Sequence, residues 1–157
     1  MADWIEPGHR APDFTLPAFD GTKLKLSALR GKPVVLYFYP RDNTPGCTRE
    51  ACAFRDRKAA WKKLGAQVLG VSPDSVTSHQ KFRDKYQLDF PLLADTDHKV
   101  AEEYGAWREK NLYGKKSMGI QRSTWLIDAI GNVARAWKKV NVDGHDDEVI
   151  AALKALE

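Results

Sequence analysis

The sequence of 157 residues predicts a single α/β domain with helices on both faces of a central mixed sheet. Two observations lead to this fold class. Short apolar runs at 34–39 and 67–71 suit strands that are buried on both faces, and each is followed by a segment with helical spacing of apolar residues. After this alternation, the chain continues with a hairpin and a final amphipathic helix. Together these patterns predict a sheet that combines parallel and antiparallel strands.

The first 65 residues contain an expected hairpin, the longest apolar run and a helix. In order, the elements are a hairpin of 13–16 and 23–26, a turn at 27–30, a buried strand at 34–39 and a helix over 47–64. The hairpin follows from alternating polarity around Asp20-Gly21. The buried strand breaks at Pro40, where turn-forming residues begin. The helix follows from the spacing of Ala51, Phe54 and Trp61.

The rest of the chain continues the alternation and then changes pattern. In order, the elements are a strand at 67–71, a helix from caps at 72–75 to Tyr86, a strand at 90–93, a short helix ending near 104, a long loop over 106–120, a hairpin of 123–127 and 133–138, and a helix over 146–156. Segment 106–120 is assigned to a loop because its glycines and lysines show no clear periodicity. The final helix places Val149, Ile150 and Leu153 on one face.

Composition is that of an ordinary globular protein, with 43% hydrophobic and 29% charged residues. The longest uncharged apolar run, at 34–39, is far shorter than a bilayer span, so we expect no membrane partner. Residues 1–7 lack the basic and apolar regions of a secretion signal. Two cysteines are too few for a disulfide scaffold, and the expected location is therefore the cytoplasm.

The net charge of +4 does not predict a nucleic-acid partner. Its lysines occur as separate pairs among acidic residues, at 62–63, 115–116 and 138–139, and no long basic run exists. The four histidines are scattered along the chain, and two cysteines five positions apart do not support a closed zinc site. We therefore expect neither a metal nor a cofactor.

The chemistry of the chain is expected at Cys47, which the pattern places in the first turn of a helix. A helix N-terminus offers free N–H groups and a positive dipole end, and both favour a thiolate. Cys52 follows five positions later. Five residues of ideal helix separate two Cα atoms by about 8–9 Å, whereas a disulfide needs less than about 7 Å. If the two cysteines pair within one molecule, the first helical turns must unwind.

A stabilised thiolate alone is a weak catalyst, because enzymes supply rate enhancements of roughly a millionfold or more. Further groups must position an electrophile and stabilise the charge on its leaving group. The hydroxyl of Thr44 and the N–H groups of Gly46 and Cys47 are candidates, and Gly46 has no side chain to block approach. Arg122, directly before the strand at 123–127, is the best candidate for a fixed cation.

These residues form a recognisable pattern. A strand, a loop and a helix with cysteine at its start fit a thioredoxin-like core, to which the N-terminal hairpin is an addition. The spacing of Pro40, Thr44 and Cys47 resembles the active-site signature of the peroxiredoxins, and Arg122 falls where that family carries an essential arginine. Residues 44–52 look like the Q-type subfamily, also called bacterioferritin comigratory proteins. The similarity extends over nearly the whole chain.

The resemblance implies a thiol peroxidase that needs no cofactor. Cys47 would be the peroxidatic cysteine, which attacks hydrogen peroxide or an organic hydroperoxide and becomes a sulfenic acid. Pro40, Thr44, Gly46 and Arg122 would bind the peroxide around it. Cys52 would be the resolving cysteine that forms an intramolecular disulfide, which thioredoxin or a similar dithiol protein would reduce. The subfamily resemblance favours a monomer.

Other interpretations remain open at this point. One is a general dithiol–disulfide oxidoreductase or a redox sensor, although protein disulfide exchange favours two intervening residues rather than four. Another is a non-catalytic binding module that uses the fold as a scaffold. Since the chain has no third cysteine, Cys52 or a thiol from another molecule must resolve the sulfenic acid. Thr44 could also cap the helix, and for Glu50 a solvated helix position is favoured over a contact with Arg122.

Overall fold

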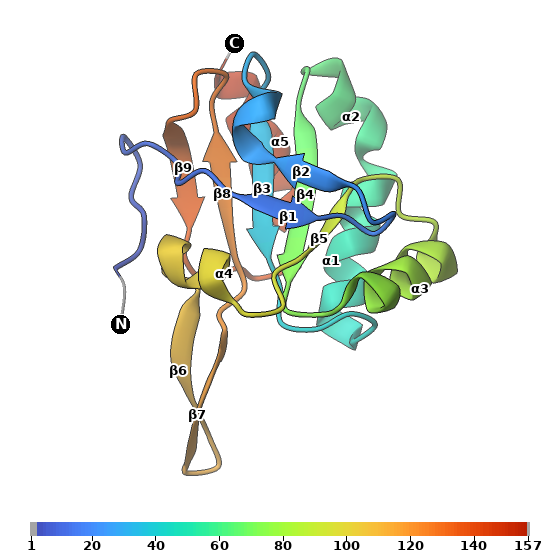
Figure 1. Cartoon of the computed structure of the whole chain (residues 1–157). Coiled ribbons are helices and arrows are strands. Elements are labelled where there is room, and N and C mark those ends of the chain that lie inside the picture. Colours follow the sequence, from blue (N-terminus) through green and yellow to red (C-terminus); the bar gives the residue numbers. More distant parts are fainter. Residues whose placement is uncertain (1–2, 157) are drawn as a thin grey trace.

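The computed structural model describes residues 3–156, which form a five-stranded mixed sheet in the order β5-β4-β3-β8-β9 (Figure 1). Strands β3, β4 and β5 are parallel, and β8 and β9 are antiparallel to their neighbours. The elements are β1 (Thr15–Pro17), β2 (Lys23–Lys25), the 3-10 helix η1 (Leu26–Leu29), β3 (Val34–Phe38), α1 (Pro45–Asp56), α2 (Lys58–Lys63), β4 (Gln67–Ser72), α3 (Val76–Tyr86), β5 (Leu92–Ala94), α4 (Lys99–Tyr104), β6 (Trp107–Leu112), β7 (Lys115–Ile120), β8 (Ser123–Ile127), β9 (Val133–Trp137) and α5 (His145–Ala155). The predicted fold class is confirmed.

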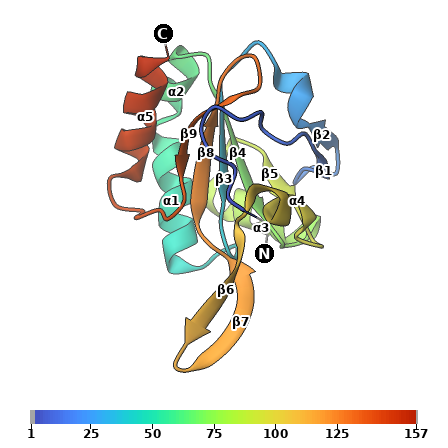
Figure 2. The same ribbon diagram turned by 90° about the vertical axis from the view of Figure 1, so that its left-hand side faces the viewer.

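The central strand β3 separates two apolar cores, because its successive side chains point to opposite faces of the sheet. Val35 and Tyr37 belong to the core that also contains Phe54 of α1. Leu36 and Phe38 belong to the core on the other face. Figure 2 shows α1, α2 and α5 on one side of the sheet, with α4 and the β1–β2 hairpin on the other. Helices therefore cover both faces, as the alternation of elements predicts.

The predicted N-terminal hairpin is present as a separate two-stranded sheet of β1 and β2. Its apolar side chains face the main sheet: Phe14 and Leu16 are buried in the same core as Phe38. Asp20 stabilises the turn, since its carboxylate accepts hydrogen bonds from the N–H and the hydroxyl of Thr22. The hairpin thus covers one core but remains separate from the central sheet.

The expectation of a long loop over 106–120 is wrong, because these residues form the β6–β7 hairpin. This hairpin projects from the body of the molecule (Figure 1). Tyr113 and Gly114 form its two-residue turn with φ of 54° and 78°, the left-handed values that such tight hairpin turns need. Most described residues of the projecting part are exposed, so neither face requires apolar side chains. The periodicity on which strand prediction depends is therefore missing.

The single helix expected over 47–64 is two helices that meet at Arg57. Backbone φ and ψ of −98° and 12° at Arg57 interrupt the helix. The guanidinium of Arg57 forms ion pairs with Asp146, at 3.2 Å, and Asp147, both of α5. The Trp61 indole N–H donates to the Phe54 carbonyl at 2.8 Å across the break. Helix α1 also begins two residues earlier than expected, since Pro45 suits the first helical position.

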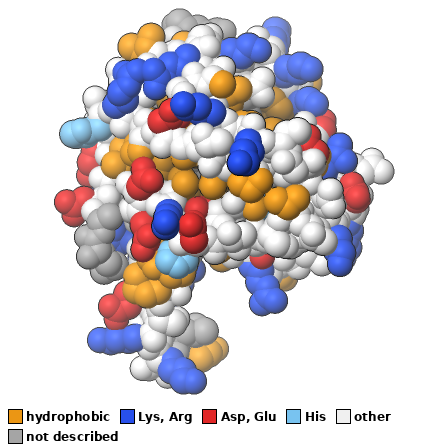
Figure 3. Space-filling model, in the orientation of Figure 1, with side chains coloured by type: hydrophobic (Ala, Val, Ile, Leu, Met, Phe, Trp, Pro, Cys, Tyr) orange, Lys and Arg blue, Asp and Glu red, His pale blue; other side chains and the backbone are white. Residues whose placement is uncertain are grey.

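The surface is mixed in charge. On the face in Figure 3, Lys and Arg side chains occur in small groups separated by acidic and uncharged side chains. Among the described helices, none is long and apolar enough to cross a membrane.

A close contact in the sheet gives a first prediction, for Gly70→Ala in β4. A Cβ at Gly70 would lie 2.9 Å from the ring carbon and hydroxyl oxygen of Tyr37, and 3.0 Å from Leu92. Overpacking of this kind typically costs about 1–3 kcal/mol. We expect that loss in the free energy of unfolding, measured with urea.

The Tyr37 hydroxyl is buried without a hydrogen-bond partner. Tyr37→Phe should therefore be nearly neutral alone and should restore part of the stability of Gly70→Ala. Equal stability of the single Gly70→Ala variant and the double variant would show that the tyrosine oxygen is not the obstacle.

Candidate active site

The predicted site residues meet at one end of the sheet because β3 and β8 are antiparallel. Phe38, the last residue of β3, pairs with Ser123, the first residue of β8. The loop that leaves β3 leads to α1 and Cys47, while Arg122 directly precedes β8. Two residues that are 75 positions apart in the sequence are thus brought to the same edge.

The thiol of Cys47 is in contact with the guanidinium of Arg122. Nη2 of Arg122 lies 3.1 Å from the sulfur and donates a hydrogen bond to it. Cys47 is 2% exposed, and the Arg122 side chain is 16% exposed. A cation removed from water attracts a thiolate much more strongly than it would at the surface. The structure therefore brings together the two residues that the sequence pairs across the sheet.

Glu50 completes this cluster, and the expectation of a solvated helix position for it is wrong. Its Oε1 accepts a hydrogen bond from Nη1 of Arg122 at 2.7 Å, and its side chain is 2% exposed. Three residues along a helix place Glu50 on the same side of α1 as Cys47. Burial raises the pKa of Glu50 to about 7, and the opposing effect of Arg122 is smaller. The second oxygen, Oε2, is buried without a hydrogen-bond partner.

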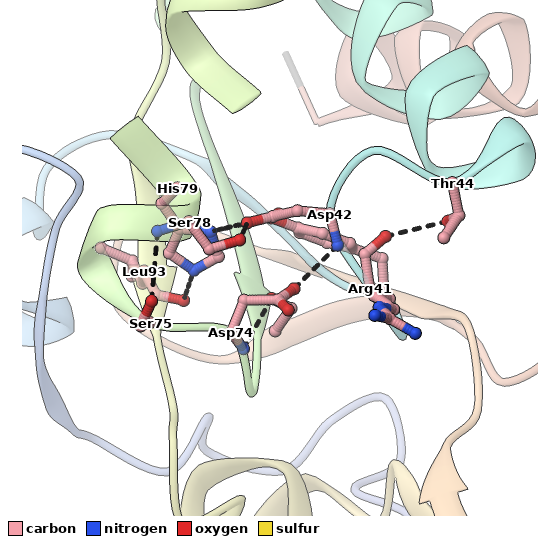
Figure 4. A network of polar contacts seen from close by, with 10 residues as sticks. Arg41, Asp42, Thr44, Asp74, Ser75, Ser78, His79 and Leu93 are labelled. Carbon is pink, nitrogen blue, oxygen red and sulfur yellow. Dashed lines mark hydrogen bonds and ion pairs between the residues drawn. The ribbon is translucent and has the colours of Figure 1, made fainter. Parts of the chain in front are cut away.

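Thr44 occupies the N-cap position of α1, but its side chain does not cap the helix. Its hydroxyl instead donates to the Arg41 carbonyl at 2.9 Å (Figure 4). The capping role considered for Thr44 is therefore wrong for its side chain. Because the hydroxyl hydrogen is engaged, the oxygen has lone pairs left to accept a hydrogen bond from a bound molecule.

Gly46 and Pro40 shape the surroundings of Cys47. A Cβ at Gly46 would lie 3.2 Å from Nη2 of Arg122, so a larger residue would press on the guanidinium. Pro40 is half-buried and directly follows the last pairing of the β3 region, in which the Tyr39 N–H donates to the Val71 carbonyl at 3.0 Å. Both residues therefore lie where the sequence places them, beside the loop that leads to α1.

Cys52 lies further along α1. Among the hydrogen bonds of the described residues, none joins Cys52 to Arg122. Both cysteines are free thiols, Cys47 buried and Cys52 partly exposed. Helix α1 runs from Pro45 to Asp56 and includes both of them. The separation of about 8–9 Å expected for an ideal helix therefore applies, and a disulfide between them requires the start of α1 to unwind.

Two further features escape sequence reasoning. Lys110 of β6 is half-buried, and its side chain lies against Gly119 of β7. Its pKa is lowered by burial and by Arg122, while Cys47 acts in the opposite direction, so the β6–β7 hairpin brings a second cation to this end of the sheet. The other feature is a buried network of Asp42 and His79 beside the loop (Figure 4). No local pattern distinguishes these residues from ordinary loop and helix positions.

The Cys47 thiol has the position and the hydrogen bond to Arg122 that suit attack on a peroxide, and the matching proteins are thiol peroxidases of the peroxiredoxin class. The chain belongs to the AhpC/TSA family, whose model matches residues 7–136, and within it to the Bcp or Q-type peroxiredoxins. This confirms the predicted family.

Relatives of this subfamily match over nearly their whole length. A putative peroxiredoxin Bcp from Coxiella burnetii is 54% identical, over 95% of this chain and 99% of the relative. Peroxiredoxin Bcp from Bacillus subtilis is 49% identical, over 97% of both chains. Among solved structures, a mutant of PrxQ from Xylella fastidiosa gives a TM-score of 0.93 at 36% identity, with 99% of both chains covered.

The raised pKa of Glu50 gives a second prediction, for Glu50→Gln. A carboxyl whose pKa rises from 4.5 to about 7 on folding binds its proton more tightly in the folded state. Its contribution to stability is complete below pH 4.5 and is lost as the pH rises to about 7, by up to about 1.4 kcal/mol per pH unit. Glutamine does not titrate. The stability of Glu50→Gln relative to the parent should therefore increase between pH 5 and about 7 and stay level above that.

Urea unfolding of both proteins at closely spaced pH values measures this difference. All other titrating groups are common to the two proteins, so the difference isolates Glu50. A difference that stays constant from pH 5 to 8 would contradict the raised pKa.

Proposed function

We propose that the chain reduces hydroperoxides through a sulfenic acid on Cys47, followed by an intramolecular disulfide between Cys47 and Cys52. The observation that carries this proposal is the 3.1 Å contact between the Cys47 sulfur and Arg122 in a buried pocket. Helix dipole and guanidinium both favour the thiolate, which is the nucleophile in such chemistry. The proposal deepens the thiol peroxidase activity of the family with roles for particular residues.

In the first step, the thiolate attacks the terminal oxygen of ROOH. A sulfur–oxygen bond forms and the O–O bond breaks. The terminal oxygen keeps its hydrogen and becomes Cys47–SOH, while RO⁻ leaves and takes a proton from water. Arg122 and the free N–H groups of Gly46 and Cys47 stabilise the developing negative charge. Thr44 accepts the hydrogen bond of the peroxide O–H, since its own hydrogen is bound to Arg41.

In the second step, the start of α1 unwinds and the Cys52 thiol attacks the sulfenic sulfur. The S–O bond breaks, the S–S bond forms, and the hydroxyl leaves as water with the thiol proton. A dithiol protein such as thioredoxin then reduces the disulfide by exchange and is oxidised in turn. The alkyl peroxide reduction activity of Xanthomonas campestris bacterioferritin comigratory protein supports organic substrates. Its solved structure is 43% identical to this chain, with a TM-score of 0.89 over 99% of both chains.

We also propose that the protein acts as a single-domain monomer in the cytoplasm. Two free thiols, one of them partly exposed, suit a reducing compartment. The continuous sheet with one core on each face supports a single domain.

General dithiol–disulfide exchange is the alternative enzymatic function. It is less favoured because both cysteines lie on one unbroken helix. They can form a disulfide with each other, as thiol–disulfide exchange requires, only after local unwinding. Reduction of insulin faster than turnover of peroxide would support that alternative. A redox sensor would differ in consuming peroxide once without efficient recycling.

The proposed roles of the cysteines give a third prediction. Cys47→Ser should abolish peroxide consumption, because a hydroxyl does not replace a thiolate. Cys52→Ser should retain one rapid oxidation per molecule and lose turnover driven by thioredoxin. Stopped-flow oxidation, followed by mass analysis under non-reducing conditions, measures both. Full recycling of Cys52→Ser would assign resolution to a thiol outside this chain.

The contact between Arg122 and Cys47 gives a fourth prediction. Arg122→Ala should slow the oxidation of Cys47 by about 10²–10³-fold, the usual effect of removing one donor that stabilises a transition state. Arg122→Lys should restore only part of the rate, since an ammonium does not reproduce the planar fork that binds two partners. Arg49→Ala is the matched control, because Arg49 lies on the same helix as Cys47 but pairs with Asp143 at the surface. Equal rates for Arg122→Ala and Arg49→Ala would contradict the role of Arg122.

A further inference from the structure

A buried polar network lies beside the loop that leads to Cys47, and the steps above do not use it. Asp42 of this loop is 8% exposed and His79 of α3 is fully buried. Figure 4 shows the Asp42 carboxylate directed toward Ser78 and His79. One carboxylate oxygen lies 2.7 Å from Nδ1 of His79 and 2.8 Å from the Ser78 hydroxyl. The other accepts a hydrogen bond from the Tyr39 hydroxyl at 2.6 Å.

Both ring nitrogens of His79 have hydrogen-bond partners. Its Nε2 lies 3.0 Å from the Leu93 carbonyl oxygen, which can only accept, so Nε2 carries a hydrogen. A neutral ring would then present the lone pair of Nδ1 to a carboxylate, and two acceptors would face each other at 2.7 Å. A proton must therefore lie between them. Tyr39 and Ser78 also donate to Asp42, so three side chains hold this carboxyl group in place.

The network connects α3 to the start of α1 through the loop. The Asp42 N–H donates to a carboxylate oxygen of Asp74 at 2.8 Å, so the main chain at Asp42 is held as well as its side chain. Next to it, the Arg41 carbonyl accepts the hydrogen bond of Thr44. The Thr44 carbonyl in turn accepts from the Thr48 N–H at 2.8 Å, which is the first helical hydrogen bond of α1. A continuous series of contacts thus runs from His79 to the turn that carries Cys47.

We propose that His79 is a positioning residue: through Asp42, it holds the loop before α1 and thereby limits how readily Cys47 leaves its pocket to reach Cys52. This inference rests on the proposed disulfide mechanism. With Asp42 held, the segment that can move together with Cys47 is short, and within it Asn43 also accepts a hydrogen bond from the Tyr86 hydroxyl at 3.1 Å. When the contact with His79 is lost, fewer bonds hold Asp42, so a longer segment can join the unwound state, which gains chain entropy. Loss of the contact therefore shifts the equilibrium toward the unwound state.

The same residues invite comparison with a metal site, since donor atoms of Asp42, Asp74 and His79 lie within 4.8 Å of one another. The short bond between His79 and Asp42 uses one donor atom from each residue. Asp74 uses its inward oxygen to accept from the Asp42 N–H and from the Ser72 hydroxyl at 2.6 Å. The hydrogen bonds therefore assign a proton to this cluster in place of a metal.

Two substitutions of His79 separate its two hydrogen bonds. In His79→Asn the amide nitrogen takes the position of Nδ1 and can still donate to Asp42. In His79→Gln it takes the position of Nε2, so the bond to Leu93 is kept and the bond to Asp42 is lost. The measurement is stopped-flow tryptophan fluorescence after one equivalent of hydrogen peroxide, with mass analysis of the thiols. It resolves the oxidation of Cys47 from the formation of the disulfide.

We expect His79→Gln to form the disulfide about tenfold faster than the parent protein, which corresponds to about 1.4 kcal/mol. Under excess peroxide, its fraction of sulfinic Cys47 should fall by a similar factor, because resolution competes better with overoxidation. His79→Asn should stay close to the parent. Asp42→Asn should resemble His79→Gln, and the double variant should add little, because both changes remove the same interaction.

Val100→Ala, a change in α4 on the opposite face of the sheet, controls for a general loss of stability. It should lower the melting temperature without accelerating the disulfide step. Equal disulfide rates in His79→Gln and His79→Asn would overturn the proposal. It would also be overturned if ZnCl₂ raised the melting temperature of the parent protein but not that of His79→Gln, because this would indicate a metal site. If the parent itself forms no disulfide between Cys47 and Cys52, the proposed mechanism fails, and with it the role inferred for His79.

Discussion

The site depends on the two hydrogen bonds that the Arg122 guanidinium donates. The guanidinium bonds to the Cys47 sulfur and to the Glu50 carboxylate, two groups on the same side of α1 that are both buried. Without the cation, a thiolate and a carboxylate would share a pocket with little water, and their repulsion would favour protonation of one or both. Even with Arg122 present, burial raises the pKa of Glu50 to about 7. A single positive charge therefore stabilises two acidic groups. Near neutral pH, the stabilisation that the thiolate receives from Arg122 depends on whether Glu50 is protonated.

The position of Arg122 is a property of the sheet, whereas that of Cys47 is a property of one helix. Antiparallel pairing of β3 and β8 fixes the distance between the end of one strand and the start of the other. In the proposed mechanism the helix start, in contrast, both presents the thiol and later releases it. The remainder of α1 is firmly held: Ala51 and Phe54 are buried, and Arg57 at its end binds two acidic residues of α5. Unwinding is therefore confined to the residues between the loop and the middle of α1.

The sequence predicts most of the fold because most elements carry a strong local pattern. Buried strands such as Val34–Phe38 are continuous apolar runs, and the helices have apolar residues at helical spacing. The β6–β7 hairpin escapes prediction because its projecting strands contact mainly solvent, so no alternation is needed. The break at Arg57 escapes prediction because the contacts of Arg57 are with residues about 90 positions away and no local pattern marks them.

Prediction of the site has a similar limit. Cys47, Thr44 and Gly46 belong to one short motif, and Arg122 is found by its place before a strand and by the family pattern. The sequence favours a solvated position for Glu50 because residue type alone does not reveal its buried contact with Arg122. His79 and Asp42 depend on a contact between a loop and a helix that no spacing encodes. Burial of a charged residue is decided by its partner, and the partner is supplied by the tertiary structure.

The same charge balance explains how the proposed reaction can control its own second step. At the start of α1, the first N–H groups have no partner inside the helix, and the first helical hydrogen bond runs from Thr48 to Thr44. The attraction between the thiolate and Arg122 adds to the packing and loop contacts that keep Cys47 in its pocket. Oxidation replaces the thiolate with a sulfenic acid, which is neutral when protonated, and so weakens that attraction. The folded start of α1 is thus most stable while the thiolate is intact and less stable after peroxide has reacted, when Cys47 has to move toward Cys52.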